Sequence, residues 1–169
     1  MSGISSVLAL FLAMVLAGAA IHKLIATDRL ATAAARLTRM PLILGKPISF
    51  SVAAIEAGAA IALLAPQLRW VGAALAAGLW LVYGLALWSA WRRNERLDCG
   101  CNFGSRSAAI GPFSILRPLG LAALAALLFR LPAGSATVES VFAALTFFSL
   151  YLAAGELAAL PPLRRKHAL

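Results

Sequence analysis

Residues 4–25 read ISSVLALFLAMVLAGAAIHKLI, and this stretch sets the class of fold. It stays apolar until His22 and Lys23, and it is as long as the roughly 20 residues with which an α-helix crosses a bilayer. No Lys or Arg precedes it, whereas a secretory signal peptide begins with a basic region. We therefore expect this segment to be retained as a first membrane span.

The rest of the chain has the same character. It is 62% hydrophobic and only 12% charged, whereas soluble domains are roughly 45–50% apolar and about 25% charged. Further apolar stretches of spanning length cover about 47–64, 70–91, 112–131 and 138–160. The sequence predicts an all-α integral membrane protein, with one domain over residues 1–169 and about five transmembrane helices.

Two features between and within the spans refine this picture. In segment 27–40, apolar residues recur at helical spacing among arginines: Leu30, Ala33, Leu37 and Met40 against Arg29, Arg36 and Arg39. This pattern predicts a short amphipathic helix at the membrane surface, with its arginines facing phosphates. Small residues inside the spans are expected to let neighbouring helices approach closely, namely Gly58, Gly72, Gly78 and Gly84.

The net charge of +9 is distributed unevenly. With five spans, all but two of the 15 Lys and Arg residues fall on one side of the membrane, the exceptions being Arg69 and Arg130. The positive-inside rule then predicts an N-terminus outside and a C-terminus inside, in a bacterial inner membrane. The basic residues belong to this lipid-facing pattern, and no nucleic-acid-binding motif accompanies them.

The loop 92–111 carries the only two cysteines of the chain, Cys99 and Cys101, separated by Gly100. Alpha-carbons two residues apart are roughly 5–7 Å apart, which overlaps the range of a disulfide, and glycine permits the tight turn. Such a small ring is strained and easily reduced, which favours a redox pair over a structural bridge.

Other uses of the same pair stay open at this point. Two thiolates also suit a soft metal ion such as Cu(I), Zn(II) or a mercury-like ion, although only distant His22 and His167 are available as further ligands. Nearby arginines, including Arg117, favour the thiolate form, while Asp98 opposes it. The pair is also compatible with idle thiols in a structural or assembly subunit of a larger membrane complex.

Glu56 is the second candidate for chemistry. It lies about nine residues into its span, near mid-membrane, where an ionised carboxylate costs several kcal/mol. Such a residue faces the interior of the bundle, and its expected partners are His22, Lys23 or Arg117. It is suited to relaying protons or to hydrogen-bonding a quinone-like ligand, and the alternative is a helix–helix hydrogen bond.

An ordered set of short motifs resembles a known family. They are Gly18 with His22-Lys23-Leu24, then Pro41, then Glu56-Ala57-Gly58, and finally Asp98-Cys99-Gly100-Cys101 with Phe103-Gly104. The combination resembles the DoxX-like membrane proteins and, within them, the MauE branch of methylamine-utilisation proteins. The resemblance implies a redox-associated helical bundle that supports disulfide formation or thiol electron transfer for exported partners. It marks Cys99 and Cys101 as the redox pair and Glu56 as the intramembrane acid.

The sequence thus predicts a thiol–disulfide oxidoreductase that exchanges electrons with a thioredoxin-like or exported partner. Its supporting residues are Gly100, Asp98, His22, Lys23 and Arg117. The expected cofactor is a quinone, and the alternative function is transport or binding of a soft metal ion by Cys99 and Cys101. A homo-oligomer or a larger membrane complex is the expected assembly.

Overall fold

The computed structural model describes residues 2–93 and 112–158, and within them the chain is helical and contains no strand. In chain order the elements are α1 (Ser2–Ile25), α2 (Thr27–Thr38), the 3₁₀ turn η1 (Leu42–Leu44), α3 (Gly45–Leu64), α4 (Arg69–Arg92), α5 (Pro112–Leu127), the 3₁₀ turn η2 (Leu128–Arg130) and α6 (Val138–Ala158). Helices are the expected form here, because inside a bilayer every backbone polar group must be paired within its own segment.

Five helical segments of the described chain are long and apolar enough to cross a membrane. They cover Gly3–Ile25, Leu42–Leu64, Arg69–Arg92, Pro112–Arg130 and Val138–Ala158. The predicted all-α membrane fold is confirmed. The second span begins at Leu42, earlier than the predicted residue 47. Proline does not mark the start of the helix, because Pro47 lies in the first turn of α3, where the backbone N–H groups make no intrahelical hydrogen bond and a residue without an N–H is tolerated.

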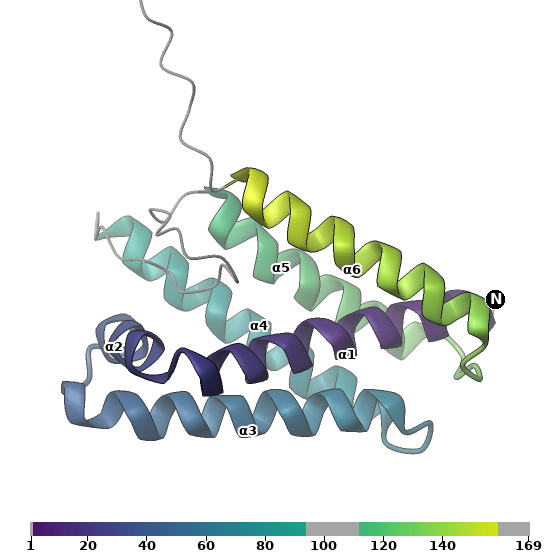
Figure 1. Ribbon diagram of the computed structural model, residues 1–169, viewed down its shortest axis with the longest axis horizontal. Coiled ribbons are helices and arrows are strands. Elements are labelled where there is room, and N and C mark those ends of the chain that lie inside the picture. The colour runs from purple at the N-terminus through teal and green to yellow at the C-terminus, as the bar shows by residue number, and fades with distance from the viewer. Residues whose placement is uncertain (1, 94–111, 159–169) are drawn as a thin grey trace, which may run out of the picture.

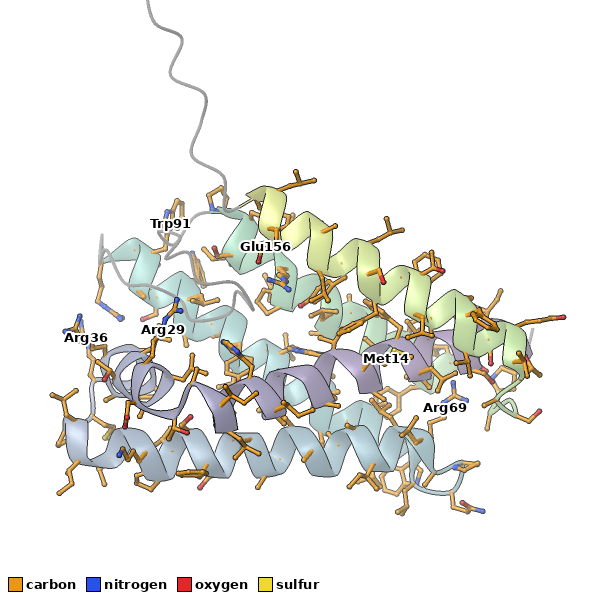
Figure 2. All side chains as sticks on the ribbon, viewed as in Figure 1. Met14, Arg29, Arg36, Arg69, Trp91 and Glu156 are labelled. Carbon is orange, nitrogen blue, oxygen red and sulfur yellow. The ribbon has the colours of Figure 1, made fainter. Side chains whose placement is uncertain are left out.

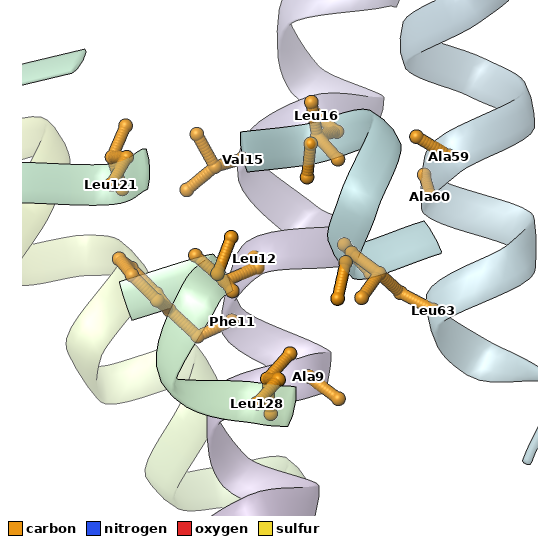
Figure 3. Packing of buried hydrophobic residues seen from close by; sticks show 14 of the residues in the cluster. Ala9, Phe11, Leu12, Val15, Leu16, Ala59, Ala60, Leu63, Leu121 and Leu128 are labelled. Carbon is orange, nitrogen blue, oxygen red and sulfur yellow. The ribbon is translucent and has the colours of Figure 1, made fainter. Parts of the chain in front are cut away.

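Helix α1 lies at the centre of the bundle, between α3 on one side and α6 on the other (Figure 1). Helix α4 packs against both α3 and α5, and α5 also touches α1. Helix α6 packs mainly against α1. The core forms where these helices meet, with Leu12 and Leu16 of α1 fully buried against Leu63 of α3 and Leu121 of α5 (Figure 3).

Two of the four predicted close-approach glycines make a close contact. An added Cβ at Gly72 would lie 2.5 Å from the backbone nitrogen of Leu63, so α3 and α4 touch through their backbones there. At Gly84 it would lie 2.8 Å from the Leu119 side chain of α5. The prediction is wrong for Gly58 and Gly78, where nothing lies within 4 Å, because these glycines face away from the neighbouring helices.

The predicted amphipathic segment forms α2, which runs across the direction of the long helices and is seen nearly end-on in Figure 1. Leu30, Ala31 and Ala35 are its buried residues, and it packs on α3. The helix ends at Thr38, so Met40 lies beyond it and is exposed, contrary to the predicted apolar face.

The bundle has two ends that differ in charge. We call the first the Lys23 end: it comprises the C-terminal ends of α1, α4 and α6, the N-terminal ends of α3 and α5, and α2. The second is the Arg69 end, where α1 and α4 begin. Figure 2 shows Arg29 and Arg36 at the Lys23 end and Arg69 at the opposite end. This is the separation on which the predicted orientation is based.

Candidate functional site

Three helices bring polar side chains together inside the bundle. Lys23 comes from the last turn of α1, Glu56 from the middle of α3 and Tyr83 from α4. The Lys23 ammonium donates hydrogen bonds to both carboxylate oxygens of Glu56, with Nζ 2.7 Å from Oε1 and 2.8 Å from Oε2. The Tyr83 hydroxyl donates to the same Oε1 over 2.9 Å. We call these three residues the Lys23–Glu56–Tyr83 cluster.

The cluster lies deep in the membrane-spanning part of the fold. With a rise of 1.5 Å per residue, Glu56 is about 16 Å from the start of α3 and about 12 Å from its end. Tyr83 is about 14 Å from the end of α4. Lys23, by contrast, is only two residues from the end of α1. It reaches this depth because α3 extends past α1, and α2 packs against that extension.

The close contact between α2 and α3 depends on Gly45, the first residue of α3. An added Cβ at Gly45 would lie 2.2 Å from the backbone oxygen of Ala31, so a larger residue would push α2 away. Asp28 and Lys46 tie the same two helices at the surface, with Lys46 Nζ 2.9 Å from Asp28 Oδ1. These contacts hold α2 against the first part of α3, at the Lys23 end of the bundle.

Burial makes the contact between Lys23 and Glu56 energetically important. The side chain of Glu56 is 1% exposed and that of Lys23 is 18% exposed. A buried charge is tolerated when it is paired and its remaining hydrogen-bonding capacity is used. Glu56 meets both conditions, because the ammonium spans its two oxygens and Tyr83 adds a third hydrogen bond. The Lys23 ammonium also lies 5.4 Å from the centre of the Tyr83 ring, within range of a cation–π interaction.

Of the three predicted partners of Glu56, the structure shows Lys23 in contact with it. Arg117 instead places its guanidinium 4.1 Å from the centre of the Tyr151 ring, which joins α5 to α6. Tyr151 packs edge-to-face on Phe11, with ring centres 5.9 Å apart. His22 precedes Lys23 in α1 and is partly exposed.

The remaining predicted site residues, Asp98, Cys99, Gly100 and Cys101, lie outside the described residues. The described chain leaves the bundle at Arg93 and re-enters it at Pro112, both at the Lys23 end. Across residues 2–93 and 112–158, no three His, Cys, Asp or Glu side chains are grouped so as to hold a metal ion.

One polar residue was not recognised as a site from the sequence. The sequence predicts for Arg69 only a charge at the edge of a span that contributes to the orientation. In the fold, however, Arg69 is buried, with 7% exposed. Its position directly after a turn and before a long apolar run gave no signal of burial.

Fold and site together define a small multi-pass helical membrane protein with a buried acid–base cluster in its core. The profile of the family described as "Methylamine utilisation protein MauE" matches residues 1–131. A curated relative from Methylophilus methylotrophus, named "Methylamine utilization protein MauE", is 33% identical over 165 residues, which cover 93% of this chain and 87% of the relative. The chain belongs to the MauE family. No solved structure matches it.

Proposed function

We propose that this chain is a membrane thiol–disulfide redox protein serving a methylamine-utilisation system. Cys99 and Cys101 would exchange electrons with a thioredoxin-like or exported partner and support its disulfide formation or maturation. The observation that carries the proposal is the placement of the only two cysteines, spaced Cys-Gly-Cys, in a family member with a buried acid–base cluster between α1, α3 and α4. Five residues separate Arg93 from Cys99, so chain length alone keeps the alpha-carbon of Cys99 within about 20 Å of that of Arg93.

The exchange is a pair of thiol–disulfide displacements. A thiolate of the Cys99–Cys101 pair attacks the partner's disulfide, forming a mixed disulfide and releasing one partner thiolate. The second thiolate attacks the mixed disulfide, which leaves a Cys99–Cys101 disulfide and a reduced partner. Two electrons have then passed to the partner, and the same steps run in reverse when the relative reduction potentials are reversed.

The pair needs a second redox molecule to complete a cycle. With two cysteines in the chain, no second thiol pair is available to receive or supply the electrons. We propose a membrane quinone for the direction in which the partner's disulfide is formed: the partner's thiols reduce the Cys99–Cys101 disulfide, and the quinone reoxidises the dithiol, taking up two electrons and two protons to become a quinol. The matching two protons come from the dithiol as it forms the disulfide.

Glu56 is the proposed intramembrane acid of this chemistry. Its carboxylate is hydrogen-bonded to two groups that carry protons, the Lys23 ammonium and the Tyr83 hydroxyl. Lys23 is the more exposed member of the ion pair and lies in the last turn of α1. In this proposal the cluster passes protons between mid-membrane and the side at which the described chain stops at Arg93 and resumes at Pro112.

Single cysteine variants test the exchange directly. Either Cys99→Ser or Cys101→Ser removes the thiol that resolves the mixed disulfide, so one of the two variants should accumulate a covalent adduct with its partner. Membranes are quenched with acid and alkylated, and adducts are sought by non-reducing electrophoresis and mass spectrometry. The adduct should disappear with dithiothreitol and be absent from the Cys99→Ser, Cys101→Ser double variant.

Two further arms separate the proposal from its alternatives. Glu56→Gln should slow adduct formation by about 10²-fold, the lower range for loss of an acid–base group, while Lys46→Met should leave it unchanged. Stoichiometric binding of Cu(I) that needs both cysteines, without any adduct, would instead assign the pair to a soft metal. Full function of the double cysteine variant would assign the chain to an assembly role.

A further inference from the structure

A second polar site lies at the opposite end of the bundle, around Arg69. Arg69 is the first residue of α4 and is 7% exposed. Its Nη2 donates to the backbone oxygen of Ser5 in α1. Its Nε is fully buried and has no hydrogen-bond partner among the described residues. Figure 2 shows the Arg69 side chain beside the first half of α1.

The charge of Arg69 lacks a counter-ion within the described part of the chain. The ion pairs found there, Lys23 with Glu56 and Lys46 with Asp28, do not involve Arg69. A guanidinium has five N–H donors, and a buried cation without an anion costs several kcal/mol. One backbone oxygen satisfies little of this requirement, so the described residues do not complete the site.

The surroundings of Arg69 are fixed by neutral contacts. The Ser5 hydroxyl donates to the backbone oxygen of Pro132 over 2.7 Å, and the Ser6 hydroxyl donates to that of Ser135 over 3.0 Å. These bonds hold the connection between η2 and α6 against the start of α1. They contribute no negative charge, so the electrostatic requirement of the guanidinium is not met by this connection.

The N-terminus of α4 adds to the positive potential at the same place. Its N-cap residue is Leu68, and no side chain caps the first backbone N–H groups. The first N–H groups of a helix have no intrahelical acceptor, and the helix dipole adds a partial positive charge there. Arg69 is itself the first residue of α4, so its guanidinium is attached to the turn that carries these N–H groups.

We propose that Arg69 and the N-terminus of α4 bind a phosphate group, supplied by a phospholipid at the Arg69 end. Phosphate oxygens match the planar fork of a guanidinium and the N–H groups of a helix N-terminus. Trp70 follows Arg69 and is 65% exposed, and tryptophan at the start of a span is typical of the headgroup region. The phosphate would accept hydrogen bonds from Nε and from the free N–H groups of α4. This site is independent of the thiol chemistry.

The test compares lipid retention and anion-dependent stability. Wild type, Arg69→Gln, Arg69→Lys and the control Arg130→Gln, which removes the exposed basic residue at the same end, are purified in detergent. Native mass spectrometry then measures the phospholipid that remains bound. We expect wild type and Arg130→Gln to retain a phospholipid and both Arg69 variants to lose it, because lysine keeps the charge but lacks the fork.

A titration on the wild-type protein decides the source of the phosphate, even where a variant fails to fold. The thermal transition of delipidated protein is followed with added phospholipid micelles or with inorganic phosphate, each against a matched chloride control. A rise with phospholipid alone supports the lipid site. A rise with both supports the phosphate site and assigns it to a soluble anion. The proposal is overturned where no lipid is retained and neither addition raises the transition.

Discussion

Replacing Lys23 with methionine is expected to lower the free energy of unfolding by about 3 kcal/mol, the lower end of the cost of breaking a buried ion pair. The reason is the partner that remains. Glu56 is 1% exposed, and without the ammonium its carboxylate keeps a single hydrogen bond, from Tyr83. The lower end applies because Lys23 is 18% exposed, so water reaches part of the pair. Unfolding in mixed micelles of mild detergent and dodecyl sulfate measures the change.

A double variant separates the ion pair from the space that Lys23 fills. Combining Lys23→Met with Glu56→Gln removes both charges, and the amide oxygen still accepts from Tyr83. Replacing both members of a buried pair by neutral groups of similar volume is often neutral or stabilising, so the double variant should recover most of the lost stability. The matched control is Lys46→Met: its side chain and that of Asp28 are 62% and 87% exposed, and loss of their contact should cost less than about 1 kcal/mol.

Equal losses in Lys23→Met and Lys46→Met would show that the buried pair contributes no more than a surface one. A double variant less stable than Lys23→Met alone would show that the two side chains act independently. Either result would contradict a stabilising contact between Lys23 and Glu56.

Gly72→Ala should destabilise the protein by about 2 kcal/mol, within the range for overpacking. The new Cβ would lie 2.5 Å from the nitrogen of Leu63, 2.9 Å from the carbonyl carbon of Ala62 and 3.0 Å from the oxygen of Ala59. All three atoms belong to the backbone of α3, so no side chain can rotate away and α4 must shift. The shift should also lengthen the Tyr83–Glu56 hydrogen bond, because Tyr83 is carried by α4.

Gly78→Ala is the matched control, six residues further along the same helix. Nothing lies within 4 Å of its added Cβ, so the substitution should raise stability by about 0.5 kcal/mol, as glycine-to-alanine changes in helices do. The two changes are chemically identical and should act in opposite directions. Similar effects at both positions would contradict the backbone contact between α3 and α4.

The spans could be predicted from the sequence because length and hydropathy are sufficient to define them. Residues 4–25 and 70–91 agree with the structure to within a residue at each end. Length and hydropathy do not predict which face of a span packs against which neighbouring helix. Gly72 and Gly78 are the same residue type on the same helix, and only the position of α3 distinguishes the buried one from the open one.

The candidate site could be predicted in part for the same reason. A carboxylate near mid-membrane requires a partner, so the position of Glu56 predicts a contact with a nearby basic residue such as Lys23. The choice among His22, Lys23 and Arg117 depends on helix packing: α5, which carries Arg117, packs mainly on α4, and its guanidinium lies on the Tyr151 ring. Tyr83 joins the cluster because α4 turns that face toward α3. The burial of Arg69 likewise follows from the way the start of α1 packs over it.

The proposed function requires that Cys99 and Cys101 cycle between a dithiol and a disulfide. Membranes containing the protein are equilibrated with a series of reduced and oxidised thiol buffers, quenched with acid, and labelled with a maleimide that adds a fixed mass per thiol. Because the chain has two cysteines, the mass shift counts their state directly. We expect two labels under reducing buffers and none under oxidising ones, with a reversible transition between them. Two labels under every condition would contradict thiol–disulfide exchange by this pair.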